Sequence, residues 1–173
     1  MSSPLPEPWL RGPIAGVPAV LQPAAHALVM ALEDCERAAS GLTVEELWAS
    51  PGGAAPVGFH LRHLVGSTDR LLTYARGASL DAAQRAALAA EAAPGEPRPT
   101  AAQLVAAWRA AVDAALAQLR ATPEASLGDA REVGRAKLPS TVLGLLFHAA
   151  EHASRHTGQV VTTAKIVRFD RQG

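Results

Sequence analysis

Histidines recur at four-residue intervals near the carboxyl end of the chain, in the stretch FHAAEHASRHTGQV at residues 147–160. If this stretch is helical, His148, His152 and His156 lie on one stripe, because side chains four residues apart stack one turn above another. Two imidazoles at that spacing can bind one divalent metal ion at about 2.0–2.1 Å from each nitrogen, with a third ligand from another element. The alternative is a set of ordinary helix histidines held by hydrogen bonds. Three histidines in register favour the metal site.

A second stretch, residues 57–76, predicts a helix on which a polar stripe runs beside an apolar face. The apolar face, spaced by three and four residues, comprises Val57, Leu61, Leu64, Thr68, Leu71 and Ala75. The polar stripe comprises His60, His63, Ser67, Arg70 and Tyr74. Either His60 or His63 can supply the third ligand, and the periodicity centres the core face nearer His60.

A site of three histidines keeps open coordination positions for water or substrate, and open positions indicate chemistry. A closed structural zinc site usually needs thiolates, and Cys35 is the single cysteine of the chain. We expect Cys35 to be a small packed residue of the first helix. Candidate helpers that could orient a substrate are Arg70, Tyr74 and His148, although Arg70 could instead pair with Asp69 or a glutamate.

The elements that must position these residues are four helices of about 20–28 residues, which imply a four-helix bundle. Residues 1–16, rich in proline, predict an extended arm with Trp9 as its anchor, and residues 17–173 a single domain. Roughly 23 residues join the second and third helices, enough to cross the bundle. The four predicted helices span residues 17–40, 57–76, 100–121 and 140–167. The first should begin near Pro23, and Ser140 should cap the last. Thr43 and Glu46 predict a short helical connector, and residues 131–137 predict an extended piece.

Composition supports a helical protein and argues against some partners. Hydrophobic residues make up 49% of the chain, much of it alanine, and aromatic residues only 4%, which favours closely packed helices. The 16 basic residues equal the 16 acidic ones, so no basic field attracts nucleic acid or anionic lipid. A single cysteine fits a reducing compartment, and no stretch predicts a signal peptide or a membrane span. We therefore expect a cytoplasmic protein.

Two motifs resemble the DinB/YfiT-like superfamily of metal-binding four-helix bundles. They are GFHLRHLVGSTDRLL at residues 58–72 and EHASRHTGQV at residues 151–160. The resemblance extends over about residues 17–167 and implies metal ligands at His63, His152 and His156, with His60 as the alternative to His63. Gly158 and Gln159 also match. The chain departs from the usual pattern at Phe59 and Thr157, which leaves the subfamily open.

The resemblance also implies a range of functions. Members include thiol-dependent transferases and isomerases that use bacillithiol, mycothiol or glutathione, so it implies a metal-activated thiol that attacks an electrophilic small molecule. A metal-dependent hydrolase is the nearest variant, and a non-catalytic, metal-stabilised stress-response module is the alternative of another class. Zinc or nickel is the expected metal, and a homodimer is plausible.

A third pattern, HAAEH at residues 148–152, matches the H-x-x-E-H motif of one class of zinc peptidases. That mechanism needs another acidic ligand well downstream, whereas the only acidic residue after His152 is Asp170. We therefore interpret Glu151 and Arg155 as an i, i+4 ion pair on the helix flank.

Overall fold

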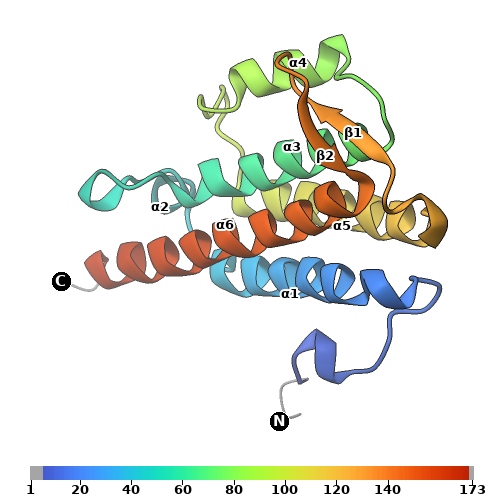
Figure 1. The fold of residues 1–173 in the computed structure, drawn as a ribbon. Helices are drawn as coiled ribbons and strands as arrows, with labels where there is room; N and C mark the ends of the chain where they lie inside the picture. The colour runs from blue at the N-terminus through green and yellow to red at the C-terminus, as the bar shows by residue number, and fades with distance from the viewer. Residues whose placement is uncertain (1–5, 172–173) are drawn as a thin grey trace.

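Four long helices pack side by side in the computed structural model, which describes residues 6–171 (Figure 1). They are α1 (Gln22–Ala39), α3 (Val57–Ala75), α5 (Ala101–Ala121) and α6 (Val142–Asp170). Each packs against two others, because α6 and α5 both contact α1 and α3. The predicted all-α four-helix bundle is confirmed.

The helix directions follow from contacts between side chains. His60 faces His156 while His63 faces His152, so α3 and α6 run antiparallel. Gln118, near the end of α5, donates to the carbonyl of Leu72, near the end of α3, which makes these two helices parallel. The chain must therefore return along the whole bundle between them, and this predicted long connection carries α4 (Ala82–Ala90) on the outer side of α3 (Figure 1).

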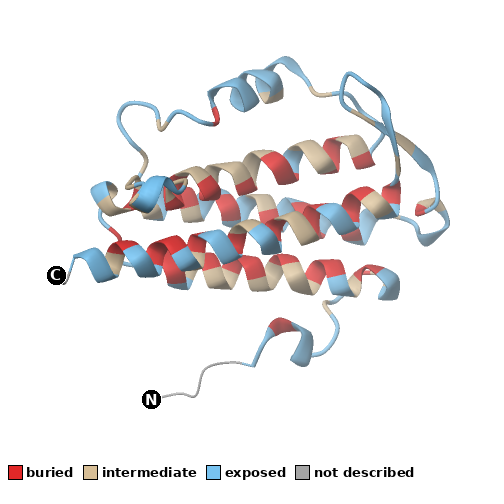
Figure 2. Ribbon diagram, turned by 60° about the vertical axis from the view of Figure 1, so that its left-hand side comes forward, coloured by how far each residue is buried: buried red, intermediate tan, exposed pale blue. Residues whose placement is uncertain are grey.

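The core lies where the apolar stripes of the helices meet, and Figure 2 shows the buried residues turned toward the inside of the bundle. On α3 the predicted face is buried except for Leu71, which is partly buried. The buried stripe of α5 follows the helical period through Leu104, Trp108, Val112, Ala115, Leu116 and Leu119. By contrast, α4 contributes no buried residue, so it lies on the bundle as an added layer.

Short elements link the four helices. The connector α2 (Val44–Leu47) begins with the predicted capping box, in which Thr43 and Glu46 each accept a backbone N–H from the other. Between α5 and α6, β1 (Ala130–Val133) and β2 (Leu138–Thr141) form an antiparallel hairpin where the sequence predicts one extended piece. The predicted cap of the last helix was one residue early: Ser140 belongs to β2, and Thr141 accepts the N–H of Gly144.

The described part of the N-terminal arm is held on α1 by polar contacts. Arg11 donates two hydrogen bonds to Glu33, at 2.6 and 2.8 Å, and His26 Nε2 donates to the carbonyl of Gly12 at 3.0 Å. The predicted anchor was wrong, because Trp9 is 59% exposed while its neighbour Pro8 is buried. Residues 1–5 of the predicted arm and 172–173 of the predicted domain lie outside the described residues, and the division into arm and domain stays a prediction.

None of the helices within residues 6–171 combines the length and the apolar character that crossing a membrane would require.

Candidate metal centre

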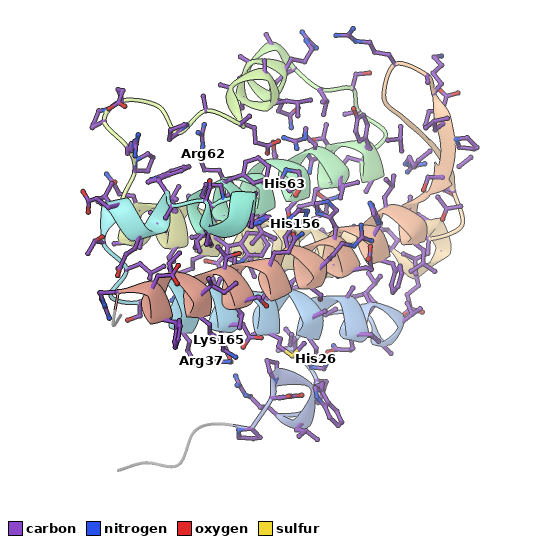
Figure 3. The ribbon with its side chains drawn as sticks, turned by 90° about the vertical axis from the view of Figure 1, so that its left-hand side faces the viewer. His26, Arg37, Arg62, His63, His156 and Lys165 are labelled. Carbon is purple, nitrogen blue, oxygen red and sulfur yellow. The ribbon has the colours of Figure 1, made fainter. Side chains whose placement is uncertain are left out.

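One histidine of α3 meets two histidines of α6 at the middle of the helix pair. One ring nitrogen from each of His63, His152 and His156 lies within 4.8 Å of the others, and Figure 3 shows His63 and His156 on the two facing helices. The Nε2 atoms of His63 and His152 are 3.4 Å apart. Two nitrogens that bind one tetrahedral ion at about 2.0–2.1 Å lie roughly 3.3 Å from each other. The donor atoms and their spacing therefore fit a divalent metal ion.

Burial keeps the imidazoles of His152 and His156 uncharged at neutral pH. It is the main cause that lowers the pKa of His156 to about 4, and the neighbouring His63, His152 and His60 lower it further. Burial likewise lowers the pKa of His152, with His63 as the next cause. An uncharged imidazole offers a nitrogen lone pair, which is what a metal ion requires. At neutral pH the cluster is therefore ready to bind a cation without first losing protons from His152 and His156.

His60 lies deeper than the three-histidine group and is 5% exposed. Its Nδ1 is 3.1 Å from Nδ1 of His156, a hydrogen-bond distance, so one of the two nitrogens donates to the other. The helical period correctly placed His60 nearer the core. The structure brings His63, and not His60, into the group whose nitrogens converge.

The outer nitrogen of His63 faces a residue that the sequence did not indicate. Glu91 directly follows α4, and its Oε2 is 3.2 Å from Nδ1 of His63 and 3.1 Å from a guanidinium nitrogen of Arg70. Glu91 is 28 positions along the chain from His63, so no helical spacing links them. Only the return of the connection along α3 brings the carboxylate to the cluster.

The three candidate helpers lie in different surroundings. Arg70 forms an ion pair with Glu91, so its partner is a glutamate and not Asp69. Its side chain is largely buried and is not free to contact a substrate beside the histidines. Tyr74 lies about 16 Å from His63 along α3 and lines a separate hollow beside the hairpin. His148 is at the edge of the cluster, with its ring 5.6 Å from that of His152 and its Nδ1 3.2 Å from Glu151. The predicted ion pair between Glu151 and Arg155 is confirmed.

A hollow of about 220 Å³ has Phe59 in its wall, and no histidine within residues 6–171 lines it. The ring of Phe59 stacks on His63, with centroids 5.7 Å apart and planes 11° from parallel, and also forms part of the hollow's wall. The other lining residues are Trp48, Ala55, Pro56, Ala92, Pro94 and Arg98. A small molecule with an apolar body can lie there against the Phe59 ring that stacks on His63.

Thr157, one of the departures in the motif, points away from the histidines. It is buried, and its hydroxyl is 3.5 Å from the sulfur of Cys35 on α1. The side chain at this position therefore packs between α6 and α1. The departure changes the helix interface and leaves the histidine cluster intact.

We expect the thiol of Cys35 to be unreactive in the folded protein. Burial raises its pKa to about 12, and the reactive thiolate is therefore nearly absent at neutral pH. Native protein mixed with a disulfide reagent at pH 7.5 should show no rapid thiol signal, and the same sample in guanidinium should release one equivalent. A fast full signal from native protein would contradict this packing.

The metal-free protein should lose stability as the pH falls from about 6.5 toward 4. An imidazole of the unfolded chain has a pKa of about 6.5, whereas that of folded His156 is about 4. Over this window the unfolded chain binds the proton first, which favours unfolding, and above it neither state is protonated there. Urea unfolding with a chelator present should show this loss, and His156→Gln should make it smaller. Equal pH dependence in both proteins would refute the assignment.

Comparison with known protein families places most of the chain within one family model. The DinB superfamily matches residues 27–160, a range that contains all three histidines of the cluster. No curated protein matches the chain.

Proposed function

The chain belongs to the DinB superfamily, and we propose on that premise that it is a metal-dependent enzyme which transfers a low-molecular-weight thiol to an electrophilic small molecule. The observation that carries the proposal is the convergence of three histidines, one of which stacks on Phe59 in the wall of an apolar hollow. His63, His152 and His156 would hold zinc or nickel and leave positions open. When bound, such an ion lowers the pKa of a coordinated thiol or water toward neutrality.

The reacting thiol must come from a small molecule. Cys35 is the single cysteine of the chain, and it is buried at the interface of α1 and α6 with a pKa of about 12. In the proposed step the small thiol loses its proton to solvent, its sulfur bonds to an electrophilic carbon, and the leaving group departs with the bonding electron pair. The apolar body of the substrate would lie against Phe59 and Trp48, and the ring of Phe59 stacks on His63.

Two alternatives use the same histidines. In a hydrolase, water takes the place of the thiol. In a non-catalytic module, the ion only joins α3 to α6 and stabilises the bundle, and no substrate is turned over.

A thiol-transfer assay separates these functions. Protein loaded with zinc or nickel is mixed with 1-chloro-2,4-dinitrobenzene and glutathione, mycothiol or bacillithiol in turn, and conjugate formation is recorded. We expect turnover with at least one thiol that is lost on chelation and in His156→Ala. Hydrolysis of activated esters without any thiol would select the hydrolase. No turnover of either kind, with a metal-dependent rise in melting temperature, would select the non-catalytic module.

A further inference from the structure

A buried carboxylate and a largely buried guanidinium lie together at the outer side of the histidine cluster. Glu91 is 9% exposed, and the side chain of Arg70 is 12% exposed. Glutamate and arginine are seldom buried, because removing a charge from water is costly even when the charges pair. No residue of α4 is buried, so apolar packing of that helix against the bundle does not explain the burial of Glu91. The burial of this pair therefore needs another explanation.

The contacts of Glu91 divide between its two oxygens. Oε1 accepts from both terminal nitrogens of Arg70, at 3.3 and 3.4 Å. Oε2 accepts from Arg70 at 3.1 Å and lies 3.2 Å from Nδ1 of His63. Arg70 thus fixes the carboxylate on one side and leaves Oε2 facing the imidazole.

This arrangement assigns the proton of His63. A carboxylate accepts hydrogen bonds and repels a nitrogen lone pair, so Oε2 of Glu91, 3.2 Å from Nδ1 of His63, favours the ring form that carries its hydrogen on Nδ1. In the neutral ring the other nitrogen, Nε2, then holds the lone pair. That atom is the one that faces Nε2 of His152 at 3.4 Å.

Gly66 leaves the space in which the pair lies. A methyl group added there would be 2.6 Å from a guanidinium nitrogen of Arg70 and 2.6 Å from Oε1 of Glu91. Both distances are shorter than any normal contact, so these two side-chain ends would have to move. Glycine in the middle of a helix is less stable than alanine by about 1 kcal/mol. The space for the Glu91–Arg70 pair is therefore obtained at the expense of helix stability.

We propose that Glu91, held in place by Arg70, is a positioning residue of the metal centre: it keeps the proton of His63 on Nδ1 and turns Nε2 toward the ion. Carboxylates that orient metal-binding histidines in this way commonly change metal affinity by about 10–100-fold when they are removed. The inference deepens the proposed function and rests on it only for metal affinity, because the position of the proton can be measured without metal.

The first test measures that proton. Nitrogen-15 NMR of the imidazole rings is recorded on metal-free protein at pH 8.5, with His63 assigned by comparison with His63→Gln. The wild type should show His63 protonated on Nδ1. The double variant Glu91→Ala/Arg70→Met, which leaves no buried charge without a partner, should show the mixture dominated by the Nε2–H form that free histidine favours. His63 protonated on Nε2 in the wild type would overturn the proposal.

The second test measures zinc affinity by competition with a chromophoric chelator. The double variant should bind zinc about 10–100-fold more weakly than the wild type. Gly66→Ala, which displaces the pair while keeping both residues, should weaken binding in the same direction. Wild-type affinity in both variants would overturn the proposal, since Glu91 and Arg70 would then be a structural ion pair only.

The chain offers a matched control. Glu151 lies 3.2 Å from Nδ1 of His148, the same separation as in the Glu91–His63 contact, but His148 is outside the three-histidine group. Glu151→Gln should leave both the His63 proton and the zinc affinity unchanged. Absence of thiol transfer by a wild-type protein that binds zinc would count against the proposed enzyme, whereas the NMR and zinc-affinity results decide the role of Glu91.

Discussion

Zinc or nickel in excess should raise the melting temperature of the protein, and the rise should vanish in His152→Ala. An ion held by His63 of α3 and by two histidines of α6 binds the folded protein and not the separated helices. At a free metal concentration a thousandfold above the dissociation constant, binding adds about 4 kcal/mol to the free energy of unfolding. For a chain of this size each kcal/mol raises the melting temperature by about 2–4 °C. Calorimetry with metal and with chelator measures the difference.

His148→Ala is the control for that experiment. His148 lies on the same stripe of α6, one turn before His152, but it is outside the three-histidine group. Its removal should leave the metal-dependent rise in place. An equal rise in His152→Ala and in the wild type would mean that the ion binds elsewhere.

Trp108→Ala should have the largest effect on stability and lower the free energy of unfolding by about 3–5 kcal/mol. Trp108 lies on α5 and is fully buried in the core, so its removal leaves a cavity. Within residues 6–171 its indole N–H has no hydrogen-bond partner, and a buried donor without an acceptor costs about 1–3 kcal/mol. Trp108→Phe removes that donor and most of the volume stays, so it should cost much less. Urea unfolding measures both.

Trp9→Ala is the matched control, because Trp9 is the same residue type on the surface. It should change the free energy of unfolding by no more than about 0.5 kcal/mol. A loss below about 1 kcal/mol in Trp108→Ala would show that α5 does not pack into the bundle as described. Since α5 supplies no histidine, Trp108→Ala should still bind metal wherever it remains folded.

Local sequence patterns predicted most of the fold because the bundle is built from long periodic helices. The apolar positions of residues 57–76 recur at the helical period, and the structure buries that face against its neighbours. The long connection after Arg76 was also predictable, because its length is incompatible with a tight turn. By contrast, a four-residue strand such as β1 or β2 has too few residues to show a period of its own.

The candidate site likewise contains residues that the sequence reveals and one residue that it does not. His152 and His156 lie one turn apart on one helix, so their spacing reveals them, and the family motif indicates His63 on the facing helix. Glu91 has no such signal, because a long connection brings it to His63 and Arg70 from a different part of the chain. Residues that meet through tertiary packing alone leave no periodic trace in one sequence.

One metal ion should bind between α3 and α6, and elemental analysis of untagged protein by plasma mass spectrometry tests this most directly. The wild type should contain about one equivalent of zinc or nickel per chain, and His63→Ala, His152→Ala and His156→Ala should each lose it. His60→Ala, which removes the neighbouring histidine outside the group, should retain metal. Wild-type protein that takes up no metal after reloading, or a loss in His60→Ala with full metal in His63→Ala, would contradict the account.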